Sequence, residues 1–468
     1  MTQAEQALRR LRPGVAWTSY VPNPNNRWDE IKVAHLLRRT TGGATAQQIS
    51  DGLKSSPADV IRDLLNGGPN QEEFEAEIVR LREGMLTAND PQQAKGLWIY
   101  RMLHSPHPFL ERMTMFWHNH FATSNAKVND LRMMQQQNET LRQHALGHFD
   151  DMLQAMTRDP AMLIWLDSQS NRRGQPNENY GRELFELFGL GVGNYTEKDI
   201  QESARALTGW SVKNGKAHFD PNLHDVGPKT ILGQTGDFGA GDVVRICLSQ
   251  PTCADFIVKK LFRFLVSETV TLDAEYIAPL AEGFRTRNYD ISWLVERLLG
   301  SWVFYSPAAI GQRVKGPVDF VIGTVKSLNG SVSPVKLAGF CDQLGQSLFY
   351  PPSVKGWEGG ERWISSTGLL FRQNLAFELT RGAGLGARSD PAKLLPSADA
   401  QSDETIARFF TNLFHQQIEE AVFRQVVEQL SRERIRLQTE FRSPRSVNGA
   451  LARTAAHLAL TLPEYQLG

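Results

Sequence analysis

Residues 108–124 read PFLERMTMFWHNHFATS, and this stretch decides how we expect the chain to fold. Its large side chains recur three and four positions apart, which is the spacing of one face of an α-helix. The residues that follow this spacing are Leu110, Met113, Phe116, Trp117 and His120. We therefore predict a helix that buries this face and carries His120 into the protein core.

The same helical spacing recurs along most of the chain, for example in residues 253–266 and 291–304. Residues 210–219, WSVKNGKAHF, differ because an Asn-Gly pair separates two short alternating runs, the strongest local signal for a two-residue β-hairpin. Residues 229–233, KTILG, are a candidate third strand. The predicted fold is mainly α, a multi-helix globular protein with one small β-hairpin or short antiparallel sheet inserted near residues 210–233.

The chain divides into four segments by composition. We expect a helical segment at residues 1–90, a helical core that carries the motifs at residues 91–385, and C-terminal helices at residues 406–468 that pack on the core. Residues 386–405, GARSDPAKLLPSADAQSDET, are rich in Ser, Asp and Pro, which is typical of a surface linker.

Composition argues against several classes of protein. The 51 Lys and Arg residues balance 51 Asp and Glu residues, so no net charge favours nucleic acid as a partner. The cysteines Cys247, Cys253 and Cys341 fit neither a disulfide framework nor a zinc knuckle, so we expect reduced thiols. The N-terminal residues lack the apolar stretch of a signal peptide, and no run reaches the roughly 20 apolar residues of a membrane span. We expect a cytoplasmic protein.

Histidines His118 and His120 are the first candidates for a functional site, because neutral imidazole binds metals and titrates near neutral pH. Side chains at positions i and i+2 of a helix point about 200° apart, so both reach one site only if the chain unwinds near Asn119. His118 should point away from the apolar face, and we expect its loss to reduce stability less than the loss of His120. A core histidine with a buried partner is the simpler interpretation of His120.

Two further stretches are rich in polar residues. In residues 176–191, PNENYGRELFELFGLG, Glu183 and Glu186 lie at i and i+3, and Arg182 can pair with glutamates one turn away. These carboxylates form either a site or ion pairs on a solvated surface. Residues 224–233, HDVGPKTILG, place His224, Asp225 and Lys229 in a loop, where site residues concentrate, although an adjacent His-Asp pair is a weak motif.

Four stretches together resemble the bacterial domain of unknown function 1800 family, over nearly the whole chain from about Trp28. They are residues 116–124, 176–210, 224–233 and 350–364, the last reading YPPSVKGWEGGERWI. The resemblance implies a mostly helical protein without an established activity, often encoded beside a second uncharacterised family that is similar to sulfatases and alkaline phosphatases. Many relatives are exported, which makes export an alternative to the cytoplasm. The motif positions in this chain are His118, Asn119, His120, Asn177, Glu178, Asn179, Arg182, Glu183, Glu186, Gly209, Trp210, His224, Asp225, Lys229, Pro352, Gly356 and Trp357.

The first functional hypothesis is a metal-assisted enzyme of the hydrolase type that acts on an anionic or sugar-like substrate. Zinc, manganese or iron would lower the pKa of a bound water and make it a nucleophile. The predicted metal ligands are His118, His120, Glu183 and His224. The predicted catalytic residues are Glu183, His224, Asp225, Arg182 and Lys229, with Arg182 and Lys229 holding the substrate's anionic group.

Two alternatives use the same motifs. Without a metal, these residues would act as general acids and bases. A non-enzymatic binding or assembly protein, with a sulfatase-like or alkaline-phosphatase-like protein as its partner, is the second alternative. Trp357 and Trp363 would then be interface anchors, although packing of their glycine-rich loop on the core is the simpler interpretation.

Overall fold

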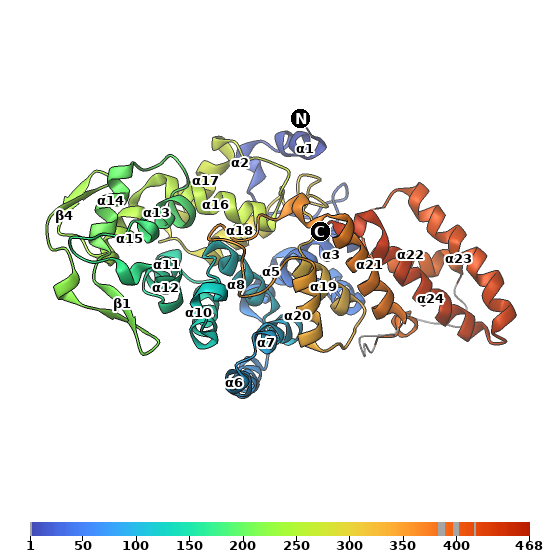
Figure 1. Cartoon of the computed structure of the whole chain (residues 1–468). Coiled ribbons are helices and arrows are strands. Elements are labelled where there is room, and N and C mark those ends of the chain that lie inside the picture. The colour runs from blue at the N-terminus through green and yellow to red at the C-terminus, as the bar shows by residue number, and fades with distance from the viewer. Residues whose placement is uncertain (1, 382–388, 396–401, 416–417) are drawn as a thin grey trace.

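The computed structural model describes residues 2–381, 389–395, 402–415 and 418–468. The fold is mainly α, as the sequence predicts: 65% of the described residues are helical, and these residues form 24 α-helices and two small antiparallel two-stranded sheets. The molecule is elongated (Figure 1), with the sheets and α13–α15 at one end, α22–α24 at the other and α8 between them.

The α-helices follow one another along the chain, and the two sheets lie between α14 and α15. The first half contains α1 (Gln3–Arg10), α2 (Pro13–Ala16), α3 (Glu30–Thr41), α4 (Ala46–Leu53), α5 (Pro57–Asn66), α6 (Gln71–Ala88), α7 (Pro91–His104), α8 (Pro108–His120), α9 (Asn125–Val128), α10 (Leu131–His144), α11 (Phe149–Thr157), α12 (Pro160–Trp165), α13 (Asn179–Glu183) and α14 (Glu197–Ala206). The second half contains α15 (Ala240–Ser249), α16 (Pro251–Leu265), α17 (Ala274–Thr286), α18 (Ile291–Leu299), α19 (Pro317–Ser327), α20 (Pro334–Gln343), α21 (Ser366–Arg381), α22 (Asp403–Phe414), α23 (Glu420–Glu440) and α24 (Pro444–Thr461).

Helix α8 is the predicted helix of residues 108–120, but it is buried on every side rather than on one face. All residues from Glu111 to His118 are buried. The reason is that two apolar cores pack against opposite sides of this helix. Met113 and Trp117 belong to one core, together with α11 and α15–α18, whereas Met115 belongs to the other, together with α7 and α19–α24.

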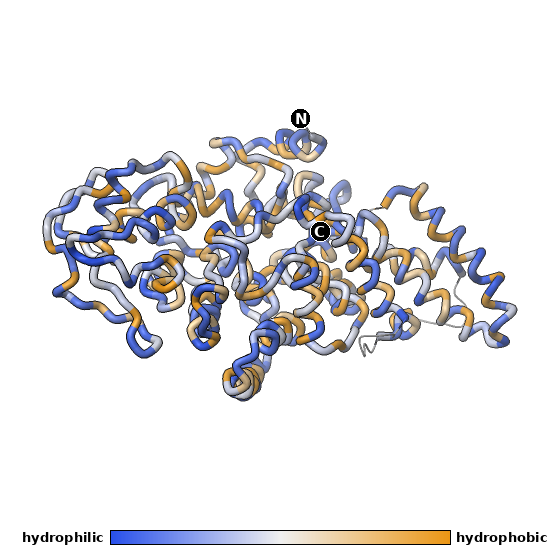
Figure 2. Tube along the Cα trace, in the orientation of Figure 1, coloured by the Kyte–Doolittle hydropathy of each residue, from blue (hydrophilic) through white to orange (hydrophobic). Residues whose placement is uncertain are grey.

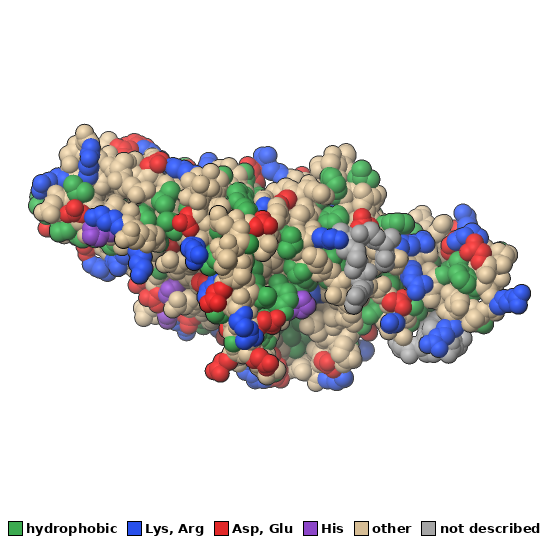
Figure 3. All heavy atoms as spheres, turned by 60° about the horizontal axis from the view of Figure 1, so that its bottom comes forward, with side chains coloured by type: hydrophobic (Ala, Val, Ile, Leu, Met, Phe, Trp, Pro, Cys, Tyr) green, Lys and Arg blue, Asp and Glu red, His purple; other side chains and the backbone are tan. Residues whose placement is uncertain are grey.

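The peripheral helices are amphipathic. Figure 2 shows apolar and polar residues alternating along α22–α24, as expected for helices that bury one side. The predicted linker at residues 386–405 lies partly outside the described residues. Between the two gaps, a short 3-10 helix at Pro391–Leu394 packs on α24. Figure 3 shows basic and acidic side chains interspersed over one face of the molecule, in line with the balanced composition.

The predicted hairpin is confirmed. Strands β1 (Trp210–Lys213) and β2 (Lys216–Phe219) pair in register, and Asn214 and Gly215 have φ of 52° and 73°, as a two-residue hairpin turn requires. The candidate third strand does not join them. Instead, β3 (Lys229–Ile231) pairs with β4 (Gln234–Gly236) in a separate sheet, because Leu232 and Gly233 form a second tight turn. None of the helices in the described part of the chain combines the length and the apolar composition that a membrane span requires.

Candidate functional site

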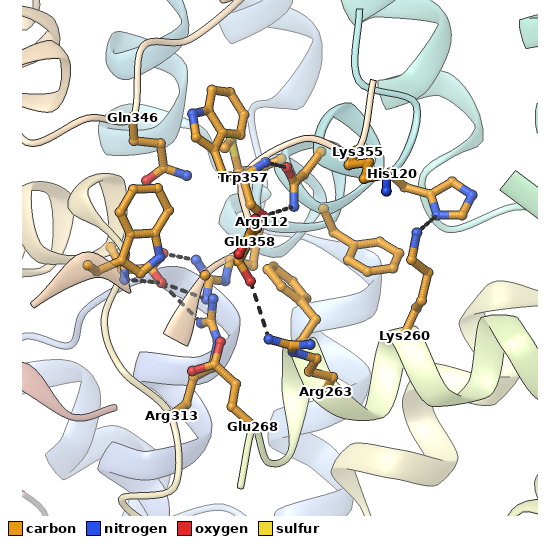
Figure 4. A pocket seen from close by; sticks show the side chains of 18 residues that line it. Arg112, His120, Lys260, Arg263, Glu268, Arg313, Gln346, Lys355, Trp357 and Glu358 are labelled. Carbon is orange, nitrogen blue, oxygen red and sulfur yellow. Dashed lines mark hydrogen bonds and ion pairs between the residues drawn. The ribbon is translucent and has the colours of Figure 1, made fainter. Parts of the chain in front are cut away.

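A cavity of about 350 Å³ lies at the junction of the two cores, beside the C-terminal half of α8 (Figure 4). Helix α16, the start of α19 and the loop of residues 350–364 form its other walls. Charged side chains line it unequally, with more cations than carboxylates. The cations are Arg112, Lys260, Arg263, Arg313 and Lys355, and the carboxylates are Glu268, Asp319 and Glu358.

His120 is a buried, neutral imidazole whose two ring nitrogens are both occupied. Nε2 lies 3.1 Å from the carbonyl oxygen of Phe188, and since that oxygen only accepts, Nε2 carries the proton. Nδ1 therefore accepts a hydrogen bond from Nζ of Lys260 at 3.0 Å. Burial and the neighbouring Lys260 hold the pKa of His120 well below its ordinary value, so the ring stays neutral.

The carbonyl groups that fix this pair come from a π-helix at Leu184–Gly189. Its last turn leaves carbonyl oxygens without helical N–H partners. Phe188 accepts from His120, and Leu187 accepts from Nζ of Lys260 at 3.2 Å. The motif of residues 176–191 thus contributes backbone carbonyl oxygens to the site. From the sequence, only charged side chains of this motif are candidates for a site.

Lys260, Arg263 and Lys355 form an unpaired set of cations. Lys260 and Arg263 lie one turn apart on α16, and Arg263 donates only to the backbone carbonyl of Glu358, at 3.3 Å. In the part of the chain that the structure describes, none of the three cations has a carboxylate within ion-pair distance. Burial and Arg263 lower the pKa of Lys260 to about 8. Arg263 and Lys355 are exposed, so they lie at the mouth of the cavity.

The opposite wall holds paired charges. Asp319 binds Arg112 through both carboxylate oxygens and accepts from Nη1 of Arg313 at 3.0 Å. Nε of Arg313 lies 3.6 Å from Glu268. Behind them lies Arg39, whose Nη2 donates to a backbone carbonyl while Nε and Nη1 have no partner among the described residues. Burial and Arg313 lower the pKa of Arg39 to about 9. These groups form a charged layer between the two apolar cores.

The C-terminal residues hold the segment that carries Arg313. The N–H of Gly468 donates to the carbonyl of Arg313 at 2.8 Å, and the N–H of Lys315 donates to the carbonyl of Gln466 at 2.8 Å. Leu467 pairs with Val314 in an antiparallel bridge. The position of Arg313 in the cavity therefore depends on residues more than 150 positions away in the sequence.

The loop of residues 350–364 closes the cavity against α8. The side-chain amide of Asn119 accepts from the N–H of Trp357 at 2.7 Å and donates to its carbonyl at 3.2 Å. Gly356 has φ of 74°, and a Cβ there would collide with Asn119, so glycine is required. Trp357 is buried, as the packing interpretation predicts, and Trp363 is half-buried in the cavity wall. The exposed tryptophan anchors expected for an assembly surface are therefore not present at Trp357.

His118 lies on the other side of α8 and does not reach this cavity, as the 200° separation predicts. It is nevertheless buried, at 1% exposure, among the rings of Trp98, Phe349 and Trp357. Burial lowers the pKa of His118 to about 3. His118 does point away from the apolar face that carries His120, as expected, but the second core covers that side of the helix and buries it.

None of the five predicted catalytic residues lines the cavity. Arg182 pairs with Glu178 at 3.1 Å and Glu197 at 2.7 Å, which is the surface ion pair weighed from the sequence. Glu183 is half-buried, and burial, with the help of Glu186, raises its pKa, while Lys355 opposes this shift. Among the five, Glu183 is therefore the residue whose pKa responds to a cation of the cavity lining, Lys355.

The remaining three hold the β-sheet end of the molecule together. Nδ1 of His224 lies 3.0 Å from the carbonyl of Thr208, and Asp225 pairs with Arg205 at 2.8 Å. Nζ of Lys229 is buried and lies 3.2 Å from Asp237.

The four predicted metal ligands do not meet in one place. His118 and His120 face opposite sides of α8, and His224 belongs to the loop beside Thr208. Across the described ranges, no three His, Cys, Asp or Glu side chains are grouped closely enough to hold a metal ion.

The site residues that sequence reasoning missed are Lys260, Arg263, Glu268, Arg313 and Asp319. A weak signal exists for two of them: Lys260 and Arg263 interrupt the apolar pattern of CADFIVKKLFRFLV at i and i+3. The other three lie in segments without a motif, and the fold alone brings them together.

Comparisons with known proteins give one match. No curated protein matches the chain, and no solved structure matches it. The sequence model of the family described as "Protein of unknown function (DUF1800)" matches residues 35–467, nearly the whole chain. The protein therefore belongs to the DUF1800 family.

Proposed function

We propose that the protein binds a small anionic molecule in this cavity and acts on it by acid–base chemistry at Lys260 and His120. The observation that carries the proposal is the unpaired set of cations, Lys260, Arg263 and Lys355, around a single cavity. Like charges held one turn apart repel each other, and the free energy of this arrangement falls when an anion binds between them.

The size and lining of the cavity favour a sugar-like anion. A volume of about 350 Å³ lies at the lower end of the range for small-molecule sites. Trp363 offers an aromatic surface, and Gln346, Glu268 and Glu358 offer oxygen and nitrogen atoms that bind hydroxyl groups. A phosphorylated, sulfated or carboxylated monosaccharide matches this combination.

The Lys260–His120 pair supplies the proton chemistry. An amine with a pKa of about 8 exists in both protonation states near neutral pH, which suits a general acid or base. Such a base would activate water for a hydrolase-type reaction. A metal-assisted reaction has less support, because the predicted ligands lie apart.

Isothermal titration calorimetry with glucose 6-phosphate, glucuronate and neutral glucose tests the proposal. We expect the two anions to bind and glucose to bind much more weakly. The double variant Arg263→Met and Lys355→Met should bind the anions roughly 10- to 100-fold more weakly, because charged hydrogen bonds are lost. The matched control, Lys259→Met with Lys216→Met, removes two exposed cations outside the cavity lining and should keep the wild-type affinity. Equal binding of glucose, or equal losses in both double variants, would contradict the proposal.

A further inference from the structure

We propose that Lys260 is a nucleophile that forms an imine with a carbonyl carbon of the ligand, so that the cavity acts on small anionic aldehydes or ketones. This inference rests on the proposed binding of an anion in the cavity and adds a covalent step to it. It names the substrate class: a carbonyl compound that also carries a carboxylate, phosphate or sulfate group.

The hydrogen bonds of Nζ match a neutral amine. Nζ donates to Nδ1 of His120 at 3.0 Å and to the carbonyl of Leu187 at 3.2 Å, and it lies 5.0 Å from the centre of the Phe256 ring. A neutral amine has two N–H groups for these two acceptors and keeps a lone pair for attack. An ammonium would carry a third hydrogen, for which the described residues offer no nitrogen or oxygen acceptor and only the face of the Phe256 ring. Figure 4 shows Lys260 directed at His120 on one side of the cavity, away from Arg313 and Glu268.

The surroundings disfavour the charged form of Lys260. Burial and Lys260 keep His120 a neutral ring, so it offers no counter-charge. Arg263 adds a like charge one turn away. Burial and Arg263 together lower the pKa of Lys260 to about 8, which leaves a reactive fraction of neutral amine near physiological pH.

The covalent step balances without any further reagent. The lone pair of Nζ attacks the carbonyl carbon and forms a C–N bond, while the C=O π electrons move to oxygen. Nζ loses a proton, which passes over Nδ1 of His120 to that oxygen and gives a carbinolamine. The remaining N–H proton of the carbinolamine then passes through Nδ1 of His120 to the hydroxyl, which leaves as water while the nitrogen electrons form the C=N bond. The net change is amine plus carbonyl to imine plus water.

The other two unpaired cations orient the ligand for this attack. Arg263 and Lys355 line the same cavity, and both are free to bind the anionic group. Lys259 is the matched comparison, because it neighbours Lys260 on α16 but is exposed and does not line the cavity. A surface lysine that reacts by chance would therefore be Lys259 as readily as Lys260.

Reductive trapping tests the inference on the full chain. The protein is incubated with glyoxylate and sodium cyanoborohydride near neutral pH, and tandem mass spectrometry locates carboxymethyl adducts on lysine. We expect the adduct fraction at Lys260 to exceed that at Lys259 by roughly tenfold or more, because lowering the pKa of an amine by one unit raises its neutral fraction about tenfold. Excess glycolate, the analogue without a carbonyl, should suppress the adduct at Lys260. Lys260→Arg should abolish it, and Lys259→Arg should not.

Four outcomes decide the question. Selective, glycolate-sensitive trapping at Lys260 supports the inference. Equal adduct fractions at Lys259 and Lys260 overturn it. A rise in melting temperature with glycolate, without trapping at Lys260, overturns the imine but leaves anion binding intact. No effect of glycolate together with no trapping overturns both proposals. The wild-type result with and without glycolate decides the matter even if Lys260→Arg fails to fold.

Discussion

Two clusters of charge in this molecule show how differently the same residue types are used. Beside the β3–β4 sheet, Arg205 pairs with Glu202 at 2.9 Å and Asp225 at 2.8 Å, and it also donates to a backbone carbonyl. At the cavity mouth, Arg263 and Lys355 have no carboxylate partner among the described residues. The paired charges hold segments of the fold together, whereas the unpaired charges around the cavity are the ones that we propose bind an anion.

The largest expected effect comes from breaking the paired wall of the cavity. Asp319→Asn leaves Arg112 and Arg313 with a buried partner that is no longer charged, and removing one member of a buried ion pair costs about 3–5 kcal/mol. Denaturant melts measure the loss. Glu358→Gln, which changes an exposed carboxylate of the same cavity, should cost under about 0.5 kcal/mol. Similar losses of stability in both variants would show that the ion pairs of Asp319 do not stabilise the fold more than the exposed Glu358 does.

The two histidines of α8 should contribute about equally to the free energy of unfolding. They should differ in anion binding, because only His120 lines the cavity. His118→Ala and His120→Ala each empty a buried ring position, and each should lower the free energy of unfolding by about 2–4 kcal/mol. Only His120→Ala should weaken anion binding, because only His120 contacts Lys260. A loss of stability in His120→Ala alone would mean that the second core does not cover His118.

The contribution of Lys260 to the free energy of unfolding should depend on pH. Its pKa in the folded protein, about 8, lies below the ordinary value of 10.5, so between these values the unfolded chain binds more protons and stability rises with pH. Below the lower value, Lys260 is charged in the folded protein, and its burial and the neighbouring Arg263 destabilise the fold by the full amount. Lys260→Met should therefore be more stable than the wild type by roughly 1–3 kcal/mol near neutral pH.

Denaturant melts of both proteins at about pH 7 and about pH 10 check this, and the difference should shrink at the higher value. A constant difference would show that Lys260 does not titrate in that window. A wild type that is more stable than Lys260→Met at neutral pH would point to a counter-charge in contact with the amine.

The smallest expected effect lies in the fully paired cluster. Arg205→Met removes partly exposed ion pairs and should lower the free energy of unfolding by about 1 kcal/mol. It should leave anion affinity unchanged, since Arg205 does not line the cavity. Calorimetry with glucose 6-phosphate checks the second point, and a tenfold loss of affinity would break the distinction between the two clusters.

Local patterns predicted most of the fold. The spacing in residues 108–120 and the turn at Asn214 and Gly215 act through neighbouring residues, and both predictions are confirmed. The burial of His118 was missed because it depends on a second core formed by residues far along the chain.

The site was harder to predict for the same reason. His120 and the loop that carries Trp357 belong to recognisable motifs, and both reach the cavity. Arg313 and Asp319 come from segments without a motif, and the oxygens that hold His120 and Lys260 are backbone atoms of a π-helix, which side-chain patterns do not reveal. The adjacent positions of His224 and Asp225 could not reveal that both side chains have partners in the fold, His224 the carbonyl of Thr208 and Asp225 the side chain of Arg205.

The most direct test of the central claim is a crystal soaked in selenate and analysed by anomalous diffraction, because selenium marks a sulfate-like anion unambiguously. We predict an anomalous peak in the cavity within hydrogen-bond distance of Arg263 and Lys355, and none beside the paired Arg205. The peak should vanish in the Arg263→Met, Lys355→Met variant. An empty cavity in crystals that bind selenate elsewhere, or a peak beside Arg205 instead, would contradict the account.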